Sequence, residues 1–365
     1  MPTSRFPIVQ AVHMTAAMAS SFDSADLPEG SGAVPGAGAP APTVYVNPIL
    51  DKDFPDPAVI HAPDGYYYAY GTQTLRDGEW LNIQVARSRD LVHWKILGDA
   101  LPEKPDWATE TQDFWAPSVI YDGSTYFMYF SATPDVCRLH ERGHALAVAT
   151  SDSPAGPFVD MGMPLLLGAG FEFIDPMAYD DPVTGKHLLY WGSGFLPIKV
   201  QELSSDRMSF AKGSNPVDLI WPNGKDGAFP RLVEASWVIR HDDFYYLFYS
   251  GDNCCGPDAE YGVMVARSRD ATGPFETLEQ AKGVPNSLIL ERSERWLAPG
   301  HNCIATDAAG QTWIIYHAID VNKPRQTQQD EINSRRILLI DKIEWKDGWP
   351  LVGTPSEGPR PAPIT

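Results

Sequence analysis

Apolar and polar residues along the chain follow a strand pattern and almost nowhere a helical one. Short runs rich in aromatic and aliphatic residues end at turns made of Gly, Asp and Asn, which is typical of β-strands. The five clearest runs are GYYYAYGTQT (65–74), STYFMYFSAT (124–133), KHLLYWGSG (186–194), DFYYLFYSGD (243–252) and QTWIIYHAID (311–320). The pattern therefore predicts an all-β protein.

The five runs belong to a repeat. Each follows a shorter predicted strand across a polar turn, and the units open at intervals of 60, 59, 59 and 64 residues, at Asp56, Ala116, Asp175, Glu234 and Ala298. Another β-rich piece follows each pair, so one unit holds about four strands, as a propeller blade does. A WD40 array would need a period of about 40–45 residues, and a β-sandwich would not explain five similar units. We predict a five-bladed β-propeller over residues 44–365.

Residues 1–43 differ in composition from the rest. The first twenty or so contain one Arg, a mildly apolar middle and small residues around Ala17–Ala19, which fits a weak secretory signal, but Gln10 and His13 interrupt the apolar part and fit an unstructured leader equally well. The stretch GSGAVPGAGAPAPT (30–43) that follows is typical of a flexible linker. We expect a leader or flexible segment, and a secreted or periplasmic location is somewhat favoured over a cytoplasmic one.

The net charge restricts the expected partners. The chain has 28 Lys and Arg against 47 Asp and Glu, a formal net charge of −19. Nucleic acid and anionic lipid need a surplus of Lys and Arg, so neither is expected to bind. No apolar run approaches the ~18 residues of a membrane span. We expect a monomer with an uncharged partner and no membrane association.

The four cysteines do not indicate whether the protein occupies an oxidising or a reducing compartment. Cys137, Cys254, Cys255 and Cys303 show no C-x-x-C spacing, so zinc is not expected. Adjacent cysteines rarely bridge each other because the ring is strained, and one bridge from this pair to Cys137 or Cys303 is possible. We expect buried, unpaired thiols, since free Cys behaves as a small apolar residue.

The repeat brings three carboxylates together. The first strand of a propeller blade lies innermost, so Asp56, Asp175 and Glu234, which open three units, converge on the central channel. A glycosidic bond is cleaved by one acid that protonates the leaving oxygen and a base or nucleophile on the opposite face. A third carboxylate near the acid raises its pKa by like-charge repulsion. The structural alternatives are turn residues before Pro for the two aspartates and a surface strand position for Glu234.

Six motifs carry a resemblance to a known family. They are FPDPAVI (54–60), FWAPSVIYDG (114–123), FIDPMAYDD (173–181), LVEASWVIRHDDFYYLFYS (232–250), APGHNCI (298–304) and IEWKDGWP (343–350). In order and spacing the chain resembles glycoside hydrolase family 43, which comprises arabinanases, α-L-arabinofuranosidases and β-xylosidases on a five-bladed propeller. The resemblance implies Asp56 as general base, Asp175 as the residue that tunes the pKa of the proton donor, and Glu234 as general acid of an inverting reaction.

Further residues are candidates for binding. Aromatic faces cover the C–H surfaces of sugars, and Phe114 and Trp115 open the second unit; the resemblance also puts an aromatic there, and blade packing is the alternative. Arg335 and Arg336 face opposite sides of a strand. The family commonly has an inward Arg that binds a sugar hydroxyl or the acids, and we favour Arg335 for this role, with a surface salt bridge as the alternative. His317 is a further candidate for the channel.

His301 is the candidate metal ligand. The resemblance implies that a His at this motif contacts a calcium or other cation in the channel, directly or through water. One His without an Asp cluster is a poor calcium site, because hard cations want six to eight oxygen ligands. We expect any ion here to be mostly hydrated and to act structurally and electrostatically.

The expected function is that of an inverting glycosidase on arabinose- or xylose-containing plant polysaccharides. Three loops, 75–80, 132–144 and 251–261, are long enough to wall a pocket and favour an exo-acting α-L-arabinofuranosidase. Endo-arabinanase and β-xylosidase activity are the alternatives on the same scaffold, and a catalytically inactive glycan-binding propeller is the alternative from another class. The configuration-retaining relatives that act on sucrose and fructan differ at the first strand, where this chain has DFPDPAV.

Overall fold

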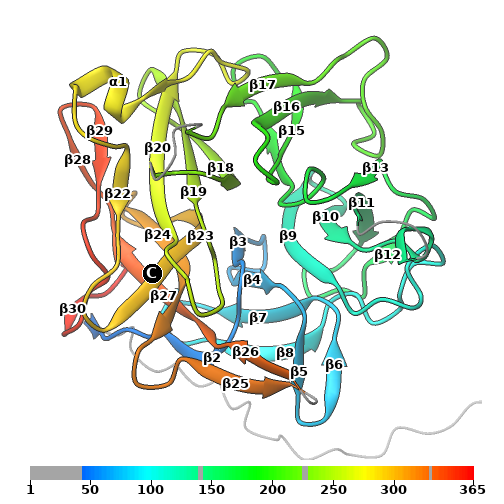
Figure 1. Cartoon of the computed structure of the whole chain (residues 1–365), viewed down its shortest axis with the longest axis horizontal. Coiled ribbons are helices and arrows are strands. Elements are labelled where there is room, and N and C mark those ends of the chain that lie inside the picture. Colours follow the sequence, from blue (N-terminus) through cyan, green and yellow to red (C-terminus); the bar gives the residue numbers. More distant parts are fainter. Residues whose placement is uncertain (1–42, 139–142, 224–228, 329–330) are drawn as a thin grey trace, which may run out of the picture. The chain divides into compact units, whose positions relative to one another are not determined.

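The structure, a computed structural model, describes residues 43–138, 143–223, 229–328 and 331–365. Within these ranges the chain consists of strands and turns, with one short α-helix, α1 (Leu278–Lys282), and one 3₁₀ turn (Asp135–Arg138). No helix in these ranges has the length and apolar character needed to cross a membrane. Five sheets form a ring in Figure 1, which confirms the predicted five-bladed propeller. Of the predicted leader segment 1–43, only Thr43 lies among the described residues, so that assignment stays a prediction.

The first three blades follow the chain in order. Blade 1 contains β3 (Ala58–His61), β4 (Tyr67–Gly71), β7 (Gln84–Ser88) and β8 (Lys95–Asp99). Blade 2 contains β9 (Phe114–Tyr121), β10 (Tyr126–Ala132), β11 (Gly143–Ser151) and β12 (Val159–Asp160), and β13 (Leu166–Ala169) also pairs with β11. Blade 3 contains β14 (Met177–Asp180), β15 (His187–Trp191), β16 (Ile198–Leu203) and β17 (Val217–Ile220).

Blade 4 also follows the chain in order, whereas blade 5 combines strands from both ends of the propeller. Blade 4 contains β18 (Val233–His241), β19 (Phe244–Gly251), β20 (Gly262–Ser268) and β21 (Glu276–Thr277), and β22 (Leu288–Leu290) also pairs with β20. Blade 5 contains β23 (Trp296–Thr306), β24 (Thr312–Asp320) and β27 (Arg336–Lys342), and its outer strand is β2 (Leu50–Asp53) from the start of the propeller. The repeat alone did not predict this closure.

Four two-stranded ribbons complete the fold. They pair β5 (Thr74–Arg76) with β6 (Glu79–Leu81), β25 (Arg325–Gln328) with β26 (Glu331–Ser334), β28 (Glu344–Lys346) with β29 (Trp349–Leu351), and β1 (Val44–Tyr45) with β30 (Arg360–Pro361). The first two extend beside the ring in Figure 1, and residues from both line the cavity described below.

Apolar side chains fill the space between each pair of neighbouring blades. The innermost strands touch in the order β3, β9, β14, β18, β23 and back to β3, so the ring is closed. Each of the five spaces contains its own cluster of buried residues, for example Tyr70 with Phe130, Leu146 with Leu189, Tyr190 with Leu247, Phe248 with Tyr316, and Ile315 with Ala69. The alternating aromatic strands of the sequence supply both faces of each sheet, and burying both faces stabilises the ring.

The same backbone conformation recurs where each blade begins. The left-handed φ values are 55° at Asp56, 48° at Ala116, 59° at Asp175, 57° at Ala235 and 48° at Ala298. The recurrent position of blade 4 is therefore Ala235, and Glu234 precedes it by one residue. This corrects the sequence alignment of the units, in which Glu234 held the same place as the two aspartates.

Polar side chains near the ends of the second strands link neighbouring blades at or near this position. Thr72, Ser131 and Ser250 accept hydrogen bonds through their hydroxyl oxygens from the backbone N–H groups of Ala116, Asp175 and His301. His317 accepts through Nδ1 from the N–H of Asp56, which closes the ring between blades 5 and 1. Between blades 3 and 4 the acceptor is the carboxylate of Asp175 itself, which binds the N–H of Ala235. The structure that holds the blades together also fixes the carboxylates.

Candidate active site

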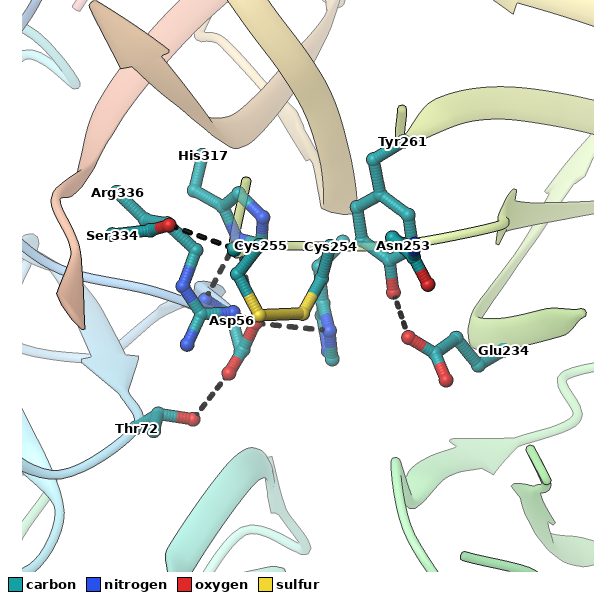
Figure 2. The surroundings of a disulfide bond; sticks show 12 residues. Asp56, Thr72, Glu234, Asn253, Cys254, Cys255, Tyr261, His317, Ser334 and Arg336 are labelled. Atoms are coloured by element: carbon teal, nitrogen blue, oxygen red, sulfur yellow. Dashed lines mark hydrogen bonds and ion pairs between the residues drawn. A yellow bond between two sulfur atoms is a disulfide. The ribbon is translucent and has the colours of Figure 1, made fainter. Parts of the chain in front are cut away.

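A cavity of about 900 Å³ opens where the blades begin, and all three predicted carboxylates line it. Asp56, Asp175 and Glu234 are 7%, 6% and 9% exposed, so each is nearly buried while facing this one space. Figure 2 shows Asp56 with Thr72, His317 and Arg336, and Glu234 with Tyr261. The prediction that the repeat would bring the three together is confirmed on placement, and each carboxylate lies in a different environment.

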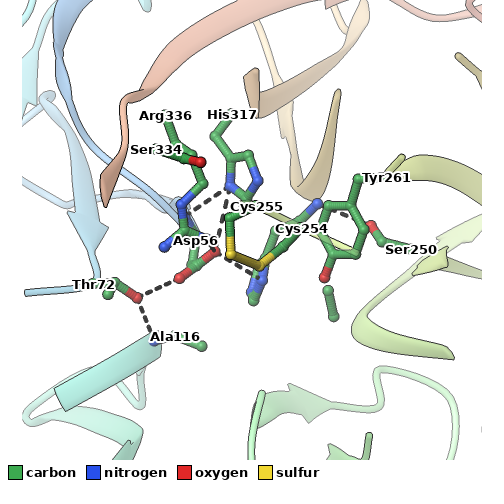
Figure 3. Close-up of polar contacts among 12 residues, drawn as sticks. Asp56, Thr72, Ala116, Ser250, Cys254, Cys255, Tyr261, His317, Ser334 and Arg336 are labelled. Carbon is green, nitrogen blue, oxygen red and sulfur yellow. Dashed lines mark hydrogen bonds and ion pairs between the residues drawn. A yellow bond between two sulfur atoms is a disulfide. The ribbon is translucent and has the colours of Figure 1, made fainter. Parts of the chain in front are cut away.

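Asp56 is surrounded by donors. Its Oδ1 lies 2.9 Å from Nη1 of Arg336 and 3.3 Å from Nδ1 of His301, and its Oδ2 accepts from the Thr72 hydroxyl at 2.5 Å. Figure 3 shows that the same Thr72 hydroxyl also meets Ala116. Burial by itself would raise the pKa of Asp56, but Arg336, the two histidines and the Thr72 hydrogen bond together hold that pKa well below its usual range. These partners therefore favour the ionised form of Asp56.

Asp175 lies among like charges. Its Oδ2 accepts from the backbone N–H of Ala235 at 3.1 Å and lies 3.9 Å from Nδ1 of His301. Burial, followed by the negative charges of Glu234 and Asp56, raises its pKa well above the usual range. The group is therefore a carboxyl that favours the protonated form or shares a proton with its neighbour.

Glu234 binds two hydroxyl groups. Ser193 donates to its Oε2, and the hydroxyl of Tyr261 donates to its Oε1 at 2.5 Å. Burial raises the pKa of Glu234, and the charge of Asp56 raises it further, while the two hydroxyls lower it in part. Tyr261 is fixed by the close approach of blade 5, because a Cβ on Gly300 would stand 2.3 Å from its ring. Only glycine at position 300 leaves room for this tyrosine.

The site thus separates two carboxyls by pKa. Asp56 is stabilised as an anion, while burial raises the pKa of Glu234 and favours its protonated form. Pairs of acids whose environments push their pKa values apart are suited to work as base and acid in one reaction. The sequence predicted the carboxylates, but Thr72, Ser193 and Tyr261 carried no motif, since their roles depend on contacts between different blades.

The predicted aromatic wall is half correct. Trp115 lines the cavity with Phe171, their rings stacked at 6.4 Å between centroids and 12° between planes. Phe114 is fully buried in the cluster between blades 1 and 2, so its prediction as a cavity wall is wrong and the packing alternative holds. Successive residues of β9 point to opposite faces. Trp80 of β6 also lines the cavity.

Arg336, not Arg335, reaches the carboxylates. The guanidinium of Arg335 binds the side chain and backbone carbonyl of Asp51, away from the cavity, so the choice of Arg335 as the inward residue is wrong. Strand β27 begins at Arg336, whose pairing with Ile319 of β24 turns its side chain toward Asp56. His317 is fully buried behind Asp56 and does not line the cavity, so it positions Asp56 rather than touching a ligand.

His301 lines the cavity, but the described residues form no ready metal site. Its Nδ1 points at the oxygens of Asp56 and Asp175. Among the described residues no group of three or more His, Cys, Asp and Glu side chains is arranged to hold a metal ion. The groups present fit a cation only if water supplies most of its ligands, so calcium stays a prediction.

One cysteine prediction is wrong. Cys254 and Cys255 are bridged to each other, and both line the cavity. The two residues lie in an irregular loop, where adjacent side chains need not point to opposite faces as they do in a strand. Cys303 is a buried free thiol, as predicted. The side chain of Cys137 lies outside the described residues.

The match to known proteins decides the family. The model of glycosyl hydrolases family 43 matches residues 45–350. The chain belongs to this family. It is accordingly a glycosidase that hydrolyses glycosidic bonds, and the predicted family and enzyme class are confirmed.

Three family 43 relatives show the range of this similarity. The chain is 28% identical to a probable arabinan endo-1,5-α-L-arabinosidase A of Aspergillus flavus, covering 81% of this chain and 90% of the relative. It is 28% identical to a xylan 1,3-β-xylosidase of Vibrio, covering 86% and 58%. The crystal structure of an exo-1,5-α-L-arabinanase from a bovine ruminal metagenomic library superimposes with a TM-score of 0.66 at 26% identity, covering 82% and 96%.

Proposed function

We propose that this family 43 hydrolase is an inverting, exo-acting α-L-arabinofuranosidase on arabinose-containing plant polysaccharides or their oligosaccharides. One observation carries the proposal: a single cavity brings together Asp56, whose pKa is held below its usual range, and Glu234, whose pKa is raised. In this mechanism Asp56 takes a proton from water as the water attacks the anomeric carbon. Glu234 donates its proton to the leaving oxygen, and the configuration inverts in one displacement.

Asp175 and Arg336 support these roles in the proposal. Burial and the nearby negative charges raise the pKa of both Asp175 and Glu234, so a proton is favoured on this pair, and Oδ2 of Asp175 fixes the backbone of Ala235 next to the acid. Arg336 keeps Asp56 ionised and holds one of its oxygens in place, while Thr72 holds the other. The two carboxylate oxygens of Glu234 are aligned by Ser193 and Tyr261.

The walls of the cavity support exo action. Trp80 comes from the β5–β6 ribbon, Gln326 and Asn333 come from the β25–β26 ribbon, and Asn253 comes from the loop after β19. Two of the three loops predicted to wall a pocket, 75–80 and 251–261, therefore do contribute to it, whereas the loop 132–144 includes residues outside the described ranges. A walled cavity accepts a chain end more readily than the middle of a polymer. The similarity to an exo-1,5-α-L-arabinanase agrees with this choice.

The deciding experiment is a substrate panel followed by NMR. Purified protein is assayed on the 4-nitrophenyl glycosides of α-L-arabinofuranose, β-D-xylopyranose and galactofuranose and on linear arabinan. We expect the arabinofuranoside to be the best substrate, with arabinose released from arabinan and no early drop in viscosity. Proton NMR should show the inverted anomer first, and a retained product would contradict the mechanism.

The second candidate is endo-arabinanase or β-xylosidase activity on the same carboxylates. The names of the Aspergillus and Vibrio relatives favour these two. A rapid fall in arabinan viscosity would select the first, and preference for the xyloside would select the second. Sugar binding without turnover on any member of the panel would select the inactive glycan-binding propeller.

A further inference from the structure

The Cys254–Cys255 disulfide lies at the catalytic carboxylates. Both cysteines line the cavity, Cys255 exposed and Cys254 partly buried. In Figures 2 and 3 the two sulfur atoms face the same space as the carboxylate of Asp56 and the hydroxyl of Tyr261. A structural disulfide normally joins distant segments of the chain, but this one joins neighbours, so it closes no long loop and adds little by constraining the unfolded chain.

The loop that carries the disulfide is anchored on both sides. The carboxylate of Asp252 accepts hydrogen bonds from the backbone of Arg231 and Leu232, just before Glu234. On the other side the N–H of Gly256 donates to the Ser334 hydroxyl at 2.9 Å, two residues before Arg336. The loop is therefore tied on one side to the residues just before the strand of the acid, and on the other side to Ser334 at the end of β26, two residues before the arginine that binds the base.

Cys254 also packs where the acid is oriented. It lies against the small apolar cluster of Tyr261, Ala298 and Ile319. Tyr261 donates to Glu234, and its ring stacks on His317 at 5.8 Å between centroids. The disulfide thus continues an apolar surface that begins in the core and ends at the carboxylates.

A sugar ring between the carboxylates needs apolar cover for its C–H groups. The carboxylates, Arg336 and His301 supply only polar contacts, and the stacked Trp115 and Phe171 cover the cavity from the side of blade 2. The disulfide comes from the loop of blade 4, on another side. A disulfide has no S–H donor and its sulfur atoms are polarisable, so it offers an apolar contact surface to C–H groups. Two thiols, in contrast, rotate freely and expose weak S–H donors.

We propose that the Cys254–Cys255 disulfide is a substrate-contacting group, which covers the C–H face of the sugar held between Asp56 and Glu234 and binds that sugar well only in its oxidised form. The proposal rests on the proposed function for the identity of the sugar. It adds a group that chooses among sugars by the shape and polarity of one ring face, without taking part in proton transfer.

Reduction of the folded protein is the first test. Tris(2-carboxyethyl)phosphine gives two electrons to the S–S bond, each sulfur takes a proton and becomes a thiol, and the oxygen of water ends on phosphorus as the phosphine oxide. Alkylation and mass spectrometry of the native protein count the thiols formed. We expect KM for the best panel substrate to rise about tenfold, equal to ~1.4 kcal/mol, with kcat and the pH profile unchanged.

Two variants distinguish loss of the disulfide from a general disturbance of the loop that carries it. The Cys254→Ser/Cys255→Ser pair should raise KM as reduction does and should no longer respond to the phosphine. Asp258→Ala is the matched control, because its side chain is exposed in the same loop and does not line the cavity. It should keep the KM and the phosphine response of the unmodified protein. Thermal unfolding checks that every form is folded.

Binding of L-arabinose and of arabinose oligosaccharides, measured by calorimetry on oxidised and reduced protein, makes the test independent of turnover. Equal affinity and equal KM in both redox states would overturn the proposal, as would a fall in kcat alone or a failure to bind any sugar. An inactive protein that binds sugar about tenfold more weakly after reduction would refute the proposed activity and support this inference.

Discussion

At the residue scale, the roles of the three acids follow from what surrounds each of them. Asp56 has Arg336, two histidines and Thr72 around it, whereas the hydrogen bonds to Glu234 come from the neutral hydroxyls of Ser193 and Tyr261. Chemically similar carboxyls therefore differ in the charge they carry. In the proposed mechanism activity falls at high pH as the raised pKa of Glu234 is passed and the acid loses its proton, and it falls at low pH only where the depressed pKa of Asp56 is passed.

Replacement of Glu234 by Gln tests the acid directly. Gln keeps the shape and the contact with Tyr261 but has no proton to give. We expect turnover of arabinan to fall by about 10³-fold, while an arabinofuranoside with a dinitrophenolate leaving group keeps most of its rate, because that group leaves without protonation. Steady-state kinetics on both substrates measures the contrast. An equal loss on the two would remove Glu234 as the acid.

The two adjacent arginines offer a matched pair. In Arg336→Met the pKa of Asp56 should rise, since its main charge partner is lost. The acidic limb of the kcat/KM profile should then move to higher pH, with a loss of at least about tenfold at its acidic end. Arg335→Met removes only a bond to Asp51 and should leave the profile in place. Identical profiles for both variants would contradict the role of Arg336.

His301 allows a test of the predicted cation. The carboxylate oxygens beside its ring attract a cation, but the described residues offer too few ligands to bind one tightly. We propose a hydrated calcium ion that acts through its charge. Chelator-treated protein should then lose a few degrees of melting temperature and regain them on calcium addition, with kcat changed less than about threefold. No response to chelation or calcium would refute the ion.

The sequence predicted which acids meet but not how they are held. Asp56, Asp175 and Glu234 could be placed because a repeat carries its opening residues to one axis. The choice between Arg335 and Arg336 failed because strand alternation gives opposite faces without saying which one faces the cavity. The disulfide was not predicted because bridges between adjacent cysteines are rare, and nothing else in the local sequence indicated one.

At the scale of elements, one type of hydrogen bond recurs between neighbouring blades, and one of the side chains that make it also binds a carboxylate of the active site. The hydroxyl of Thr72 accepts from Ala116 of the next blade and donates to Asp56. The period of about sixty residues predicted the aromatic second strands correctly. It could not show these links, because they depend on polar side chains near strand ends that look like ordinary turn residues.

Thr72→Val tests this link. Valine has the same shape but leaves the buried N–H of Ala116 without its acceptor and Asp56 without one donor. We expect the free energy of unfolding to fall by about 1–3 kcal/mol and kcat to fall as well. Ser118→Ala is the control, because Ser118 accepts from Ala178 of the next blade without touching a carboxylate. It should lose stability in chemical denaturation and keep its kcat, and a stable Thr72→Val would contradict the link.

At the scale of the whole molecule, closure of the ring depends on residues before Asp56. Strand β2 is the outer strand of blade 5, and Asn47 exchanges hydrogen bonds with Ile340 of that blade. Tyr45 and Ile49 are buried between blades 5 and 1. The sequence analysis places the start of the propeller near Val44 but assigns these residues to no blade, because a strand that pairs with a segment almost 300 residues away carries no local signal.

A pair of shortened chains tests the closure. A chain that starts at Thr43 keeps β1 and β2, whereas a chain that starts at Phe54 loses both. We expect the second to melt at least about 10 °C lower or to aggregate, since it exposes the edge of β27 and empties part of a core. Circular dichroism during heating measures the difference. Equal melting temperatures would show that the ring closes without β2.

The pairing of β1 with β30 sets Val44 beside Pro361, so the two ends of the propeller meet at its surface. A rearranged gene could join these ends by a short linker and open the chain in the exposed turn at 182–186, between β14 and β15. The circularly permuted protein would then hold β2 and β27 in one uninterrupted stretch. Every carboxylate would keep its neighbours, because the order in which a ring is synthesised is not part of its geometry.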